Sequence, residues 1–336
     1  MLGAPMSASL TLVTCTRNPT PESFRRVLEG VAALERPPDH AIEYLIIDST
    51  SEPPVASRAE VQEFVARCPW ARVIRAEAPG ISGARRAGVA ASTGSILVWL
   101  DDDNVPASDY LKQVLATAAA HPEVTVWGAG RIDVEFLAPV PDWVERTMRP
   151  TFQERAHARD EFGLATNWAP FFPVGSGLVT RRAAIERWSA ALGAGRYSLA
   201  GRTGKGLGSG EDAQIILGAV AAGEAVGVAA GLRLRHLIAA SRGTMEYLTR
   251  LEFALSASIR IARAECFPHD PEPRSFRGLG ALPAMRATVA RWRREGARAA
   301  RFEAARQLGA VSGTLRTNDR PEPVWLRAAV NVLGLR

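Results

Sequence analysis

The first 130 residues alternate between short apolar runs and amphipathic stretches. Short runs rich in apolar and β-branched residues predict strands at 10–16, 42–48, 73–74 and 95–100, and the almost uninterrupted apolar run at 95–100 predicts a strand buried on both faces of a sheet. Between them, apolar residues recur every three or four positions and predict helices at 22–34, at 61–68 and within 79–93. This alternation predicts an α/β fold, a doubly wound and mostly parallel sheet flanked by helices on both faces.

The rest of the chain continues this pattern and then becomes helical. Helices are predicted at 108–120, 182–192, 211–222 and 244–265, and strands within 125–136, 174–180 and 226–234. Residues 137–172 are irregular and are expected to form a loop-rich wall that lies partly over the site. Residues 193–210 hold seven glycines and are predicted to form a mobile loop. We therefore expect a sheet domain over 8–240 and a helical, basic C-terminal region over 241–336.

Composition limits the class of protein. The 336 residues are 47% hydrophobic, enough for a sizeable core, and the formal net charge is +6. This modest excess suits anionic partners such as phosphates or an acidic membrane surface, but it is too diffuse to indicate nucleic acid. Three widely spaced cysteines form no disulfide or zinc pattern and indicate a reducing compartment. We find no signal-peptide or spanning segment, so we expect a cytoplasmic protein, at most peripheral on the inner face of the membrane.

Three consecutive aspartates, Asp101, Asp102 and Asp103, follow the buried run at 95–100. In open α/β sheets, ligands bind outside the carboxyl ends of strands. Adjacent carboxylates repel one another unless a cation or hydrogen-bond donors offset their charge, and a hard divalent cation completes its shell with phosphates. The stretch predicts a site for a metal and a diphosphate. The alternative is a loop whose polar side chains cap the helix at 108–120.

A second acidic pair, Glu211 and Asp212, opens a helix behind the glycine-rich segment. A carboxylate there is well placed to act as general base on an acceptor hydroxyl. The alternative is a helix start capped by Ser209, with Asp212 completing a capping box.

Three further positions are candidates for binding. Asp48 ends the second strand and suits a hydrogen bond to a base or ribose, or else an Asx turn. His236 follows the last predicted strand and suits a contact to a diphosphate or metal, or else packing. Arg85 lies at the start of a helix whose amides can face phosphate, next to Arg86, and one of these arginines is expected to be a surface charge.

These motifs, in this order over roughly residues 8–250, resemble family 2 glycosyltransferases. The motifs are Thr16-Arg-Asn18, Asp48, Gly83-Ala-Arg85, Asp101–Asp103, Gly175-Ser-Gly177, Gly210-Glu-Asp212 and His236. The resemblance implies a GT-A fold, a nucleotide-diphosphate sugar donor, a divalent metal (Mg²⁺ or Mn²⁺) and direct displacement with inversion.

Roles follow by the same resemblance. Thr16, Asn18 and Asp48 correspond to nucleotide contacts, and Arg85, Asp102 and His236 to contacts on the donor side. Asp101 and Asp103 correspond to the Asp-x-Asp pair, with metal at Asp103 and Asp101, and Asp212 to the catalytic base with Glu211 beside it. The chain departs from the family pattern at Arg17, Arg86 and Ser49–Ser51, which bears on donor choice more than on reaction type.

The acceptor is expected to be a hydroxyl of a glycan or a lipid-linked glycan, in surface polysaccharide or glycan assembly. A sugar-phosphate nucleotidyltransferase is disfavoured because no glycine-rich loop with Arg and Lys follows the first strand, and an NAD-dependent oxidoreductase because Gly-x-Gly-x-x-Gly is absent there. A non-catalytic sugar- or membrane-binding protein remains the alternative. In the C-terminal region, Met285, Val289 and Trp292 lie among arginines, which predicts a basic amphipathic helix on a membrane surface or a helix packed on the sheet domain.

Overall fold

The computed structural model describes residues 8–336 except 78, 200 and 202–206. The first seven residues of the N-terminal segment and part of the predicted mobile loop at 193–210 therefore lie outside the described residues.

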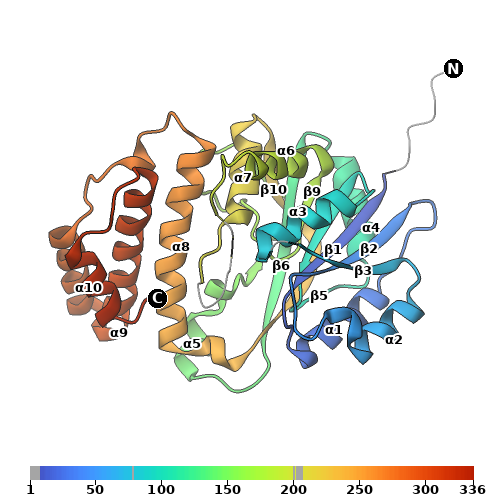
Figure 1. The fold of residues 1–336 in the computed structure, drawn as a ribbon, viewed down its shortest axis with the longest axis horizontal. Helices are drawn as coiled ribbons and strands as arrows, with labels where there is room; N and C mark the ends of the chain where they lie inside the picture. The colour runs from blue at the N-terminus through green and yellow to red at the C-terminus, as the bar shows by residue number, and fades with distance from the viewer. Residues whose placement is uncertain (1–7, 78, 200, 202–206) are drawn as a thin grey trace.

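One mixed sheet forms the centre of the molecule (Figure 1). Its main path is β3-β2-β1-β4-β9-β6-β10-β5, with β7 paired to β6 and β8 to β10. The strands are β1 (Leu10–Thr16), β2 (Ile42–Asp48), β3 (Ala71–Arg75), β4 (Ile96–Asp101), β5 (Asn104–Pro106), β6 (Val124–Phe136), β7 (Arg155–Ala156), β8 (Glu161–Gly163), β9 (Leu178–Arg181) and β10 (Ala225–Ile238). Neighbours from β3 to β4 are parallel, as are β6 and β10, whereas β9 is antiparallel to both of its neighbours.

The helices lie on both faces of the sheet and at one end of the molecule (Figure 1). They are α1 (Pro21–Ala32), α2 (Ala59–Arg67), α3 (Ile81–Ala91), α4 (Tyr110–Ala120), α5 (Asp142–Thr147), α6 (Arg182–Gly193), α7 (Glu211–Ala221), α8 (Met245–Cys266), α9 (Ala281–Thr317) and α10 (Val324–Val332). Four short 3₁₀ turns complete the chain, η1 (Val55–Ser57), η2 (Arg149–Phe152), η3 (Ala240–Gly243) and η4 (Glu272–Arg274).

The central strands are mainly apolar because they are covered on both faces. In β4, Val98 and Leu100 join the core that contains Phe24 of α1. Leu97 and Trp99 point the other way and join the core that contains Trp188 of α6. Because successive strand side chains point to opposite faces, a strand buried on both sides has no polar alternation.

The parallel register brings the ends of the first strands to one edge of the sheet. Thr16 pairs with Asp48 across β1 and β2, and Cys15 pairs with Asp101 across β1 and β4. Side chains that follow these strands therefore gather at the same edge, where ligands bind in open α/β sheets.

Several element boundaries differ from the sequence-based prediction. The last strand is longer than predicted: β10 runs on to Ile238, so His236 lies within it and pairs with Asn104 of β5. β9 begins only at Leu178, and α4 begins at Tyr110 with Asp109 at its N-cap position. The Asp101–Asp103 stretch therefore does not cap α4.

The C-terminal helices lie at the end of the molecule opposite β3, with α8 between them and the sheet (Figure 1). Ile261 of α8 joins the core shared with α6 and α7, and Phe253 of α8 joins a separate core with α9 and α10. None of the helices in the described part of the chain is both long and apolar enough to cross a membrane. The three cysteines are free and buried, as expected. The domain boundary at residue 240 stays a prediction.

Candidate active site

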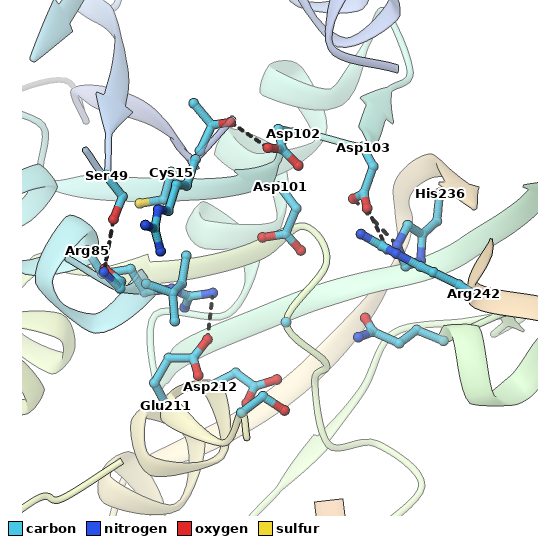
Figure 2. Close-up of a pocket in the computed structure, with 17 residues that line it drawn as sticks. Cys15, Ser49, Arg85, Asp101, Asp102, Asp103, Glu211, Asp212, His236 and Arg242 are labelled. Carbon is cyan, nitrogen blue, oxygen red and sulfur yellow. Dashed lines mark hydrogen bonds and ion pairs between the residues drawn. The ribbon is translucent and has the colours of Figure 1, made fainter. Parts of the chain in front are cut away.

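A pocket at the carboxyl ends of β1 and β4 collects most of the predicted site residues (Figure 2). Eight of them line it: Thr16, Arg85, Asp101, Asp102, Asp103, Glu211, Asp212 and His236. They come from segments up to 220 residues apart in the chain. Convergence of so many charged side chains in one hollow is a recognised mark of a functional site.

Asp102 is held by the end of the first strand. The hydroxyl of Thr16 donates a hydrogen bond to Asp102 Oδ2. Burial, followed by repulsion from the neighbouring Asp103, raises the pKa of Asp102 to about 7. Burial and the neighbouring carboxylate therefore favour the protonated form of Asp102 more than in an exposed aspartate.

Asp103 contacts two basic side chains, Arg242 and His236. Arg242 Nη1 donates to Asp103 Oδ2 at 2.8 Å, and His236 Nε2 lies 3.5 Å from Asp103 Oδ1. Burial raises the pKa of Asp103, but the charges of His236 and Arg242 outweigh this effect and hold the pKa well below its usual range. His236 is oriented by its other ring nitrogen, Nδ1, which donates to the carbonyl of Phe152 at 2.9 Å. Figure 2 shows these three side chains together on one side of the pocket.

Arg242 was not predicted from the sequence. It lies on η3, in the turn between β10 and α8, six positions after His236. The available signal was chemical: three adjacent carboxylates need cations, and an arginine just beyond the strand paired to their loop can supply one.

Arg85 and Glu211 form a buried ion pair on another side of the pocket. Arg85 Nη2 lies 3.7 Å from Glu211 Oε1, and the two residues are 3% and 6% exposed. The guanidinium also lies 5.5 Å from the ring centre of Trp99. Its Nη1 is buried with no hydrogen-bond partner among the described residues. Burial raises the pKa of Glu211, and the charge of Arg85 opposes this effect.

Asp212 is more accessible than Glu211. It is half-buried at the first turn of α7, where its Oδ1 accepts a hydrogen bond from the amide of Ala213 at 2.8 Å. The helix N-cap is Gly210, not Ser209, and no side chain caps it. A Cβ at Gly175 would lie 2.9 Å from Asp212 Oδ2, so only a glycine there leaves the carboxylate its present position.

Asn18 and Asp48 are not among the described residues that line the pocket. Asp48 is 1% exposed, and its two oxygens accept the backbone amides of Ser51 and Val55. Asn18 Oδ1 accepts a hydrogen bond from the backbone amide of Glu52, and the backbone amide of Asn18 donates to Ser51 Oγ. Both residues brace the loop after β2, which corresponds to the turn alternative for Asp48.

The pocket also contains residues that the sequence did not single out for binding, among them Cys15, Arg17, Ser49, Gly80, Gln153 and Ser209. Gln153 follows η2 and has a left-handed backbone (φ 69°). It belongs to the irregular segment at 137–172, where no sequence pattern indicates which side chains reach the pocket. That segment is expected to lie partly over the site; Gln153 lines the pocket, and the carbonyl of Phe152 contacts His236.

Within the described ranges, no three His, Cys, Asp or Glu side chains are grouped closely enough to hold a metal ion by themselves. The donor chemistry nevertheless suits a divalent cation, because Asp101, Asp103 and His236 line the same pocket. The protein groups would then supply part of the coordination shell, and Arg242 would have to leave Asp103 Oδ2.

The sequence matches the family model "Glycosyl transferase family 2" over residues 11–188, which is more than half of the chain. A search of curated proteins with this sequence found no match.

Among solved structures, the mannosyltransferase PcManGT from Pyrobaculum calidifontis, in complex with GDP-Man and Mn²⁺, is similar with a TM-score of 0.56 at 16% identity. The alignment covers 94% of this chain and 91% of that chain. The chain also aligns with S. aureus TarS, with a TM-score of 0.48 at 13% identity, covering 97% of this chain and 54% of that one. The PcManGT likeness, together with the family match, confirms the GT-A fold expected from the sequence.

Proposed function

The chain belongs to glycosyl transferase family 2, and from this premise we propose that it moves a sugar from a nucleotide-diphosphate sugar to a hydroxyl acceptor with inversion. The observation that carries the proposal is the placement of Asp212 in the same pocket as Asp101–Asp103. A displacement needs a base on the acceptor side and charge compensation on the leaving-group side. Asp212 can supply the base, and basic side chains of the same pocket, together with a cation held at Asp101–Asp103, can supply the compensation.

Asp212 is the proposed general base. Its carboxylate lines the pocket and carries no cationic partner in any ion pair of the described residues, whereas Glu211 is committed to Arg85. Asp212 takes the proton of the acceptor hydroxyl while the hydroxyl oxygen attacks the anomeric carbon. The bond between that carbon and the diphosphate oxygen breaks, and the diphosphate leaves with the electron pair.

Arg85, Arg242 and His236 are the proposed contacts for the diphosphate. Arg85 has one buried nitrogen without a hydrogen-bond partner among the described residues, and a phosphate oxygen would satisfy it. Arg242 and His236 line the pocket around Asp103. Thr16 ends β1 and donates a hydrogen bond to Asp102, which follows β4, and we propose that the nucleoside binds beside this pair.

We propose Asp103, with Asp101, as the residues that hold a divalent metal, Mg²⁺ or Mn²⁺. When bound with the donor, such an ion would offset charge on the leaving diphosphate. Two carboxylates with a diphosphate are a sufficient donor set for such an ion. The PcManGT structure, at 16% identity, contains Mn²⁺, so Mn²⁺ is the ion chosen for the test.

The proposed acceptor is a hydroxyl of a glycan or a lipid-linked glycan, in surface polysaccharide or glycan assembly. A lipid-linked acceptor would require peripheral contact with a membrane, for which the basic C-terminal region is the candidate.

The experiment is a thermal shift series with nucleotide-diphosphate sugars, each with and without Mn²⁺. A ligand at 100 times its Kd stabilises the folded state by about 2.7 kcal/mol, so the correct donor should raise the melting temperature clearly. The matching nucleoside monophosphate is the control, because it lacks the diphosphate. Donors that stabilise are then tested for release of nucleoside diphosphate with glycan acceptors. If no donor raises the melting temperature more than its monophosphate does, the proposal is wrong.

A further inference from the structure

The first part of α9 leaves a row of large apolar side chains in solvent. Leu282, Met285, Val289 and Trp292 are 50%, 59%, 39% and 56% exposed. Their spacing of three, four and three residues places them on one side of a helix. The row ends at Gly296, whose φ of 86° interrupts the helix.

The second part of α9 behaves differently. After Gly296, its apolar residues Leu308, Val311 and Leu315 are buried against Phe253 of α8 and Leu326 of α10. The second half of the helix therefore packs in a hydrophobic core, whereas the apolar row on the first half packs in none of the cores formed by the described residues.

The end of α10 extends the exposed row into a wider surface. Val289, Trp292, Val332 and Leu333 line one shallow groove, and Val332 is 85% exposed. We call the set Leu282, Met285, Val289, Trp292 and Val332 the α9–α10 face. Several large apolar side chains exposed on one side of a helix and along a neighbouring groove are typical of an interaction surface.

The charge around this face is positive. Residues 281–336 hold eleven arginines against four acidic residues, a net charge of +7, whereas the whole chain carries +6. The remaining 280 residues are therefore close to neutral. Arg286, Arg293 and Arg294 are exposed on the same part of α9 as the apolar row, and the acidic Glu295 is paired to Arg291.

We propose that the α9–α10 face binds an anionic phospholipid surface. Its apolar side chains would enter the boundary between headgroups and acyl chains, and Arg286 and Arg293 would contact lipid phosphates. A second copy of the chain fits less well, because face-to-face contact would bring the same arginines against each other. The inference rests on the proposed function only in placing a lipid-linked acceptor at that membrane.

The test is co-sedimentation of the full chain with two kinds of vesicle: phosphatidylcholine alone, and phosphatidylcholine containing about 30% phosphatidylglycerol. We expect binding to the anionic vesicles only. The variant Met285→Ser/Trp292→Ser should bind about tenfold more weakly, because it loses the apolar anchors while changing exposed side chains. The matched control is Leu164→Ser/Trp168→Ser, since Leu164 and Trp168 are 58% and 50% exposed outside the C-terminal region.

Each outcome decides the question. Equal sedimentation of the two variants, or no binding of the unchanged chain to anionic vesicles, would overturn the inference. So would a concentration-dependent dimer, measured without vesicles, that Met285→Ser/Trp292→Ser abolishes, because the face would then be a self-interface. Nucleotide-sugar binding is measured in a separate experiment without vesicles, so that it tests the proposed function alone. Its failure would remove the proposed function and leave the lipid-binding face intact.

Discussion

Glu211 and Asp212 are adjacent in the chain, but their carboxylates have different surroundings. Glu211 is 6% exposed, faces Arg85 and accepts the amide of Gly210. Asp212 is half-buried and borders the space into which a ligand would enter. A group that must exchange protons needs this access, whereas a group that balances a buried arginine does not.

Substitution of the two acids should separate catalysis from folding. Asp212→Asn removes the proposed base, and we expect sugar transfer to fall roughly 10²–10⁴-fold while the melting temperature and donor affinity stay nearly unchanged. Glu211→Gln, the control variant, leaves Arg85 buried without its counter-charge, and we expect a loss of about 3 kcal/mol in the free energy of unfolding, with a smaller direct effect on the rate. The measurements are transfer rate, donor affinity and melting temperature for both variants. Near-normal transfer by Asp212→Asn would refute the assignment of the base.

Arg242 shares Asp103 with any cation that binds there. Arg242→Gln removes the guanidinium from Asp103 Oδ2, so we expect the affinity for Mn²⁺ in the absence of nucleotide to rise several-fold and the affinity for nucleoside diphosphate to fall. Titration calorimetry with Mn²⁺, and with GDP and UDP, measures both quantities. Arg277→Gln, which changes an exposed arginine, is the control. An unchanged or weaker Mn²⁺ affinity in Arg242→Gln would show that Asp103 is not the metal ligand.

At the scale of elements, Glu43 ties together the amino ends of three strands. Its Oε1 in β2 accepts from Thr11 of β1 and from the amide and hydroxyl of Thr93, which precedes β4, at 2.6–2.8 Å. Burial raises the pKa of Glu43, but the hydrogen bonds from Thr93, Thr11 and Arg72 outweigh it and lower the pKa below its ordinary value.

This shift has a definite sign. A depressed folded-state pKa contributes stability above the pKa of the unfolded chain, near 4.3, and the contribution is lost as pH falls through the folded-state value. Glu43→Gln should therefore cost about 1–3 kcal/mol at pH 7 and progressively less below about pH 4. Urea unfolding at several pH values measures the difference, with the exposed Glu63→Gln as control. A cost that does not change with pH would contradict the prediction.

The contact between α8 and α9 depends on small residues. Cβ atoms at Gly309 and Gly313 would lie 2.3 Å from the carbonyl oxygen of Phe253 and 2.6 Å from that of Ala257. Gly313→Ala should force the helices apart and cost about 1–3 kcal/mol in the free energy of unfolding. Gly208→Ala is the control, because a Cβ at Gly208 meets nothing within 4 Å. Denaturant midpoints of the two variants should differ, and equal midpoints would show that α9 adjusts without cost.

The elements that the sequence predicted best are those whose pattern is set by burial on both faces. β1, β2 and β4 were predicted within about a residue because each contributes to two cores at once. The end of β10 was predicted too early because Arg233 and Arg235 interrupt the apolar run, although their backbone continues to pair with β6. Their side chains are exposed, so polarity there marks the solvent face rather than the strand end.

The same reasoning explains what could be predicted of the site. Asp101–Asp103 and Asp212 lie at element ends, where local sequence predicts position, and the pocket contains all four. Arg242 lies on a short turn placed by tertiary contacts, so no local pattern indicates it. Asp48 also ends a strand, but its oxygens are used by the backbone of its own loop, an outcome that sequence leaves open.

At the scale of the whole molecule, the positive charge is concentrated at one end. The sheet and its pocket belong to a nearly neutral part of the chain, and the excess positive charge lies in the C-terminal helices at the other end (Figure 1). The two proposed ligands would therefore bind in different electrostatic settings: a diphosphate beside the buried Arg85, and a lipid surface against exposed arginines.

Ionic strength should distinguish the two settings. Exposed charges are screened over about 10 Å at 0.1 M salt and about 3 Å at 1 M, whereas buried pairs are screened much less. Raising the salt from about 0.05 to 0.5 M should thus weaken vesicle binding by more than about tenfold while nucleoside diphosphate affinity changes by a smaller factor. Arg286→Gln/Arg293→Gln should flatten the salt dependence of vesicle binding, whereas Arg25→Gln/Arg67→Gln, which removes the same charge from exposed positions on α1 and α2, should leave it unchanged. Equal flattening by both pairs would mean that net charge alone attracts the chain to the vesicle, and that the arrangement of arginines beside the α9–α10 face adds nothing.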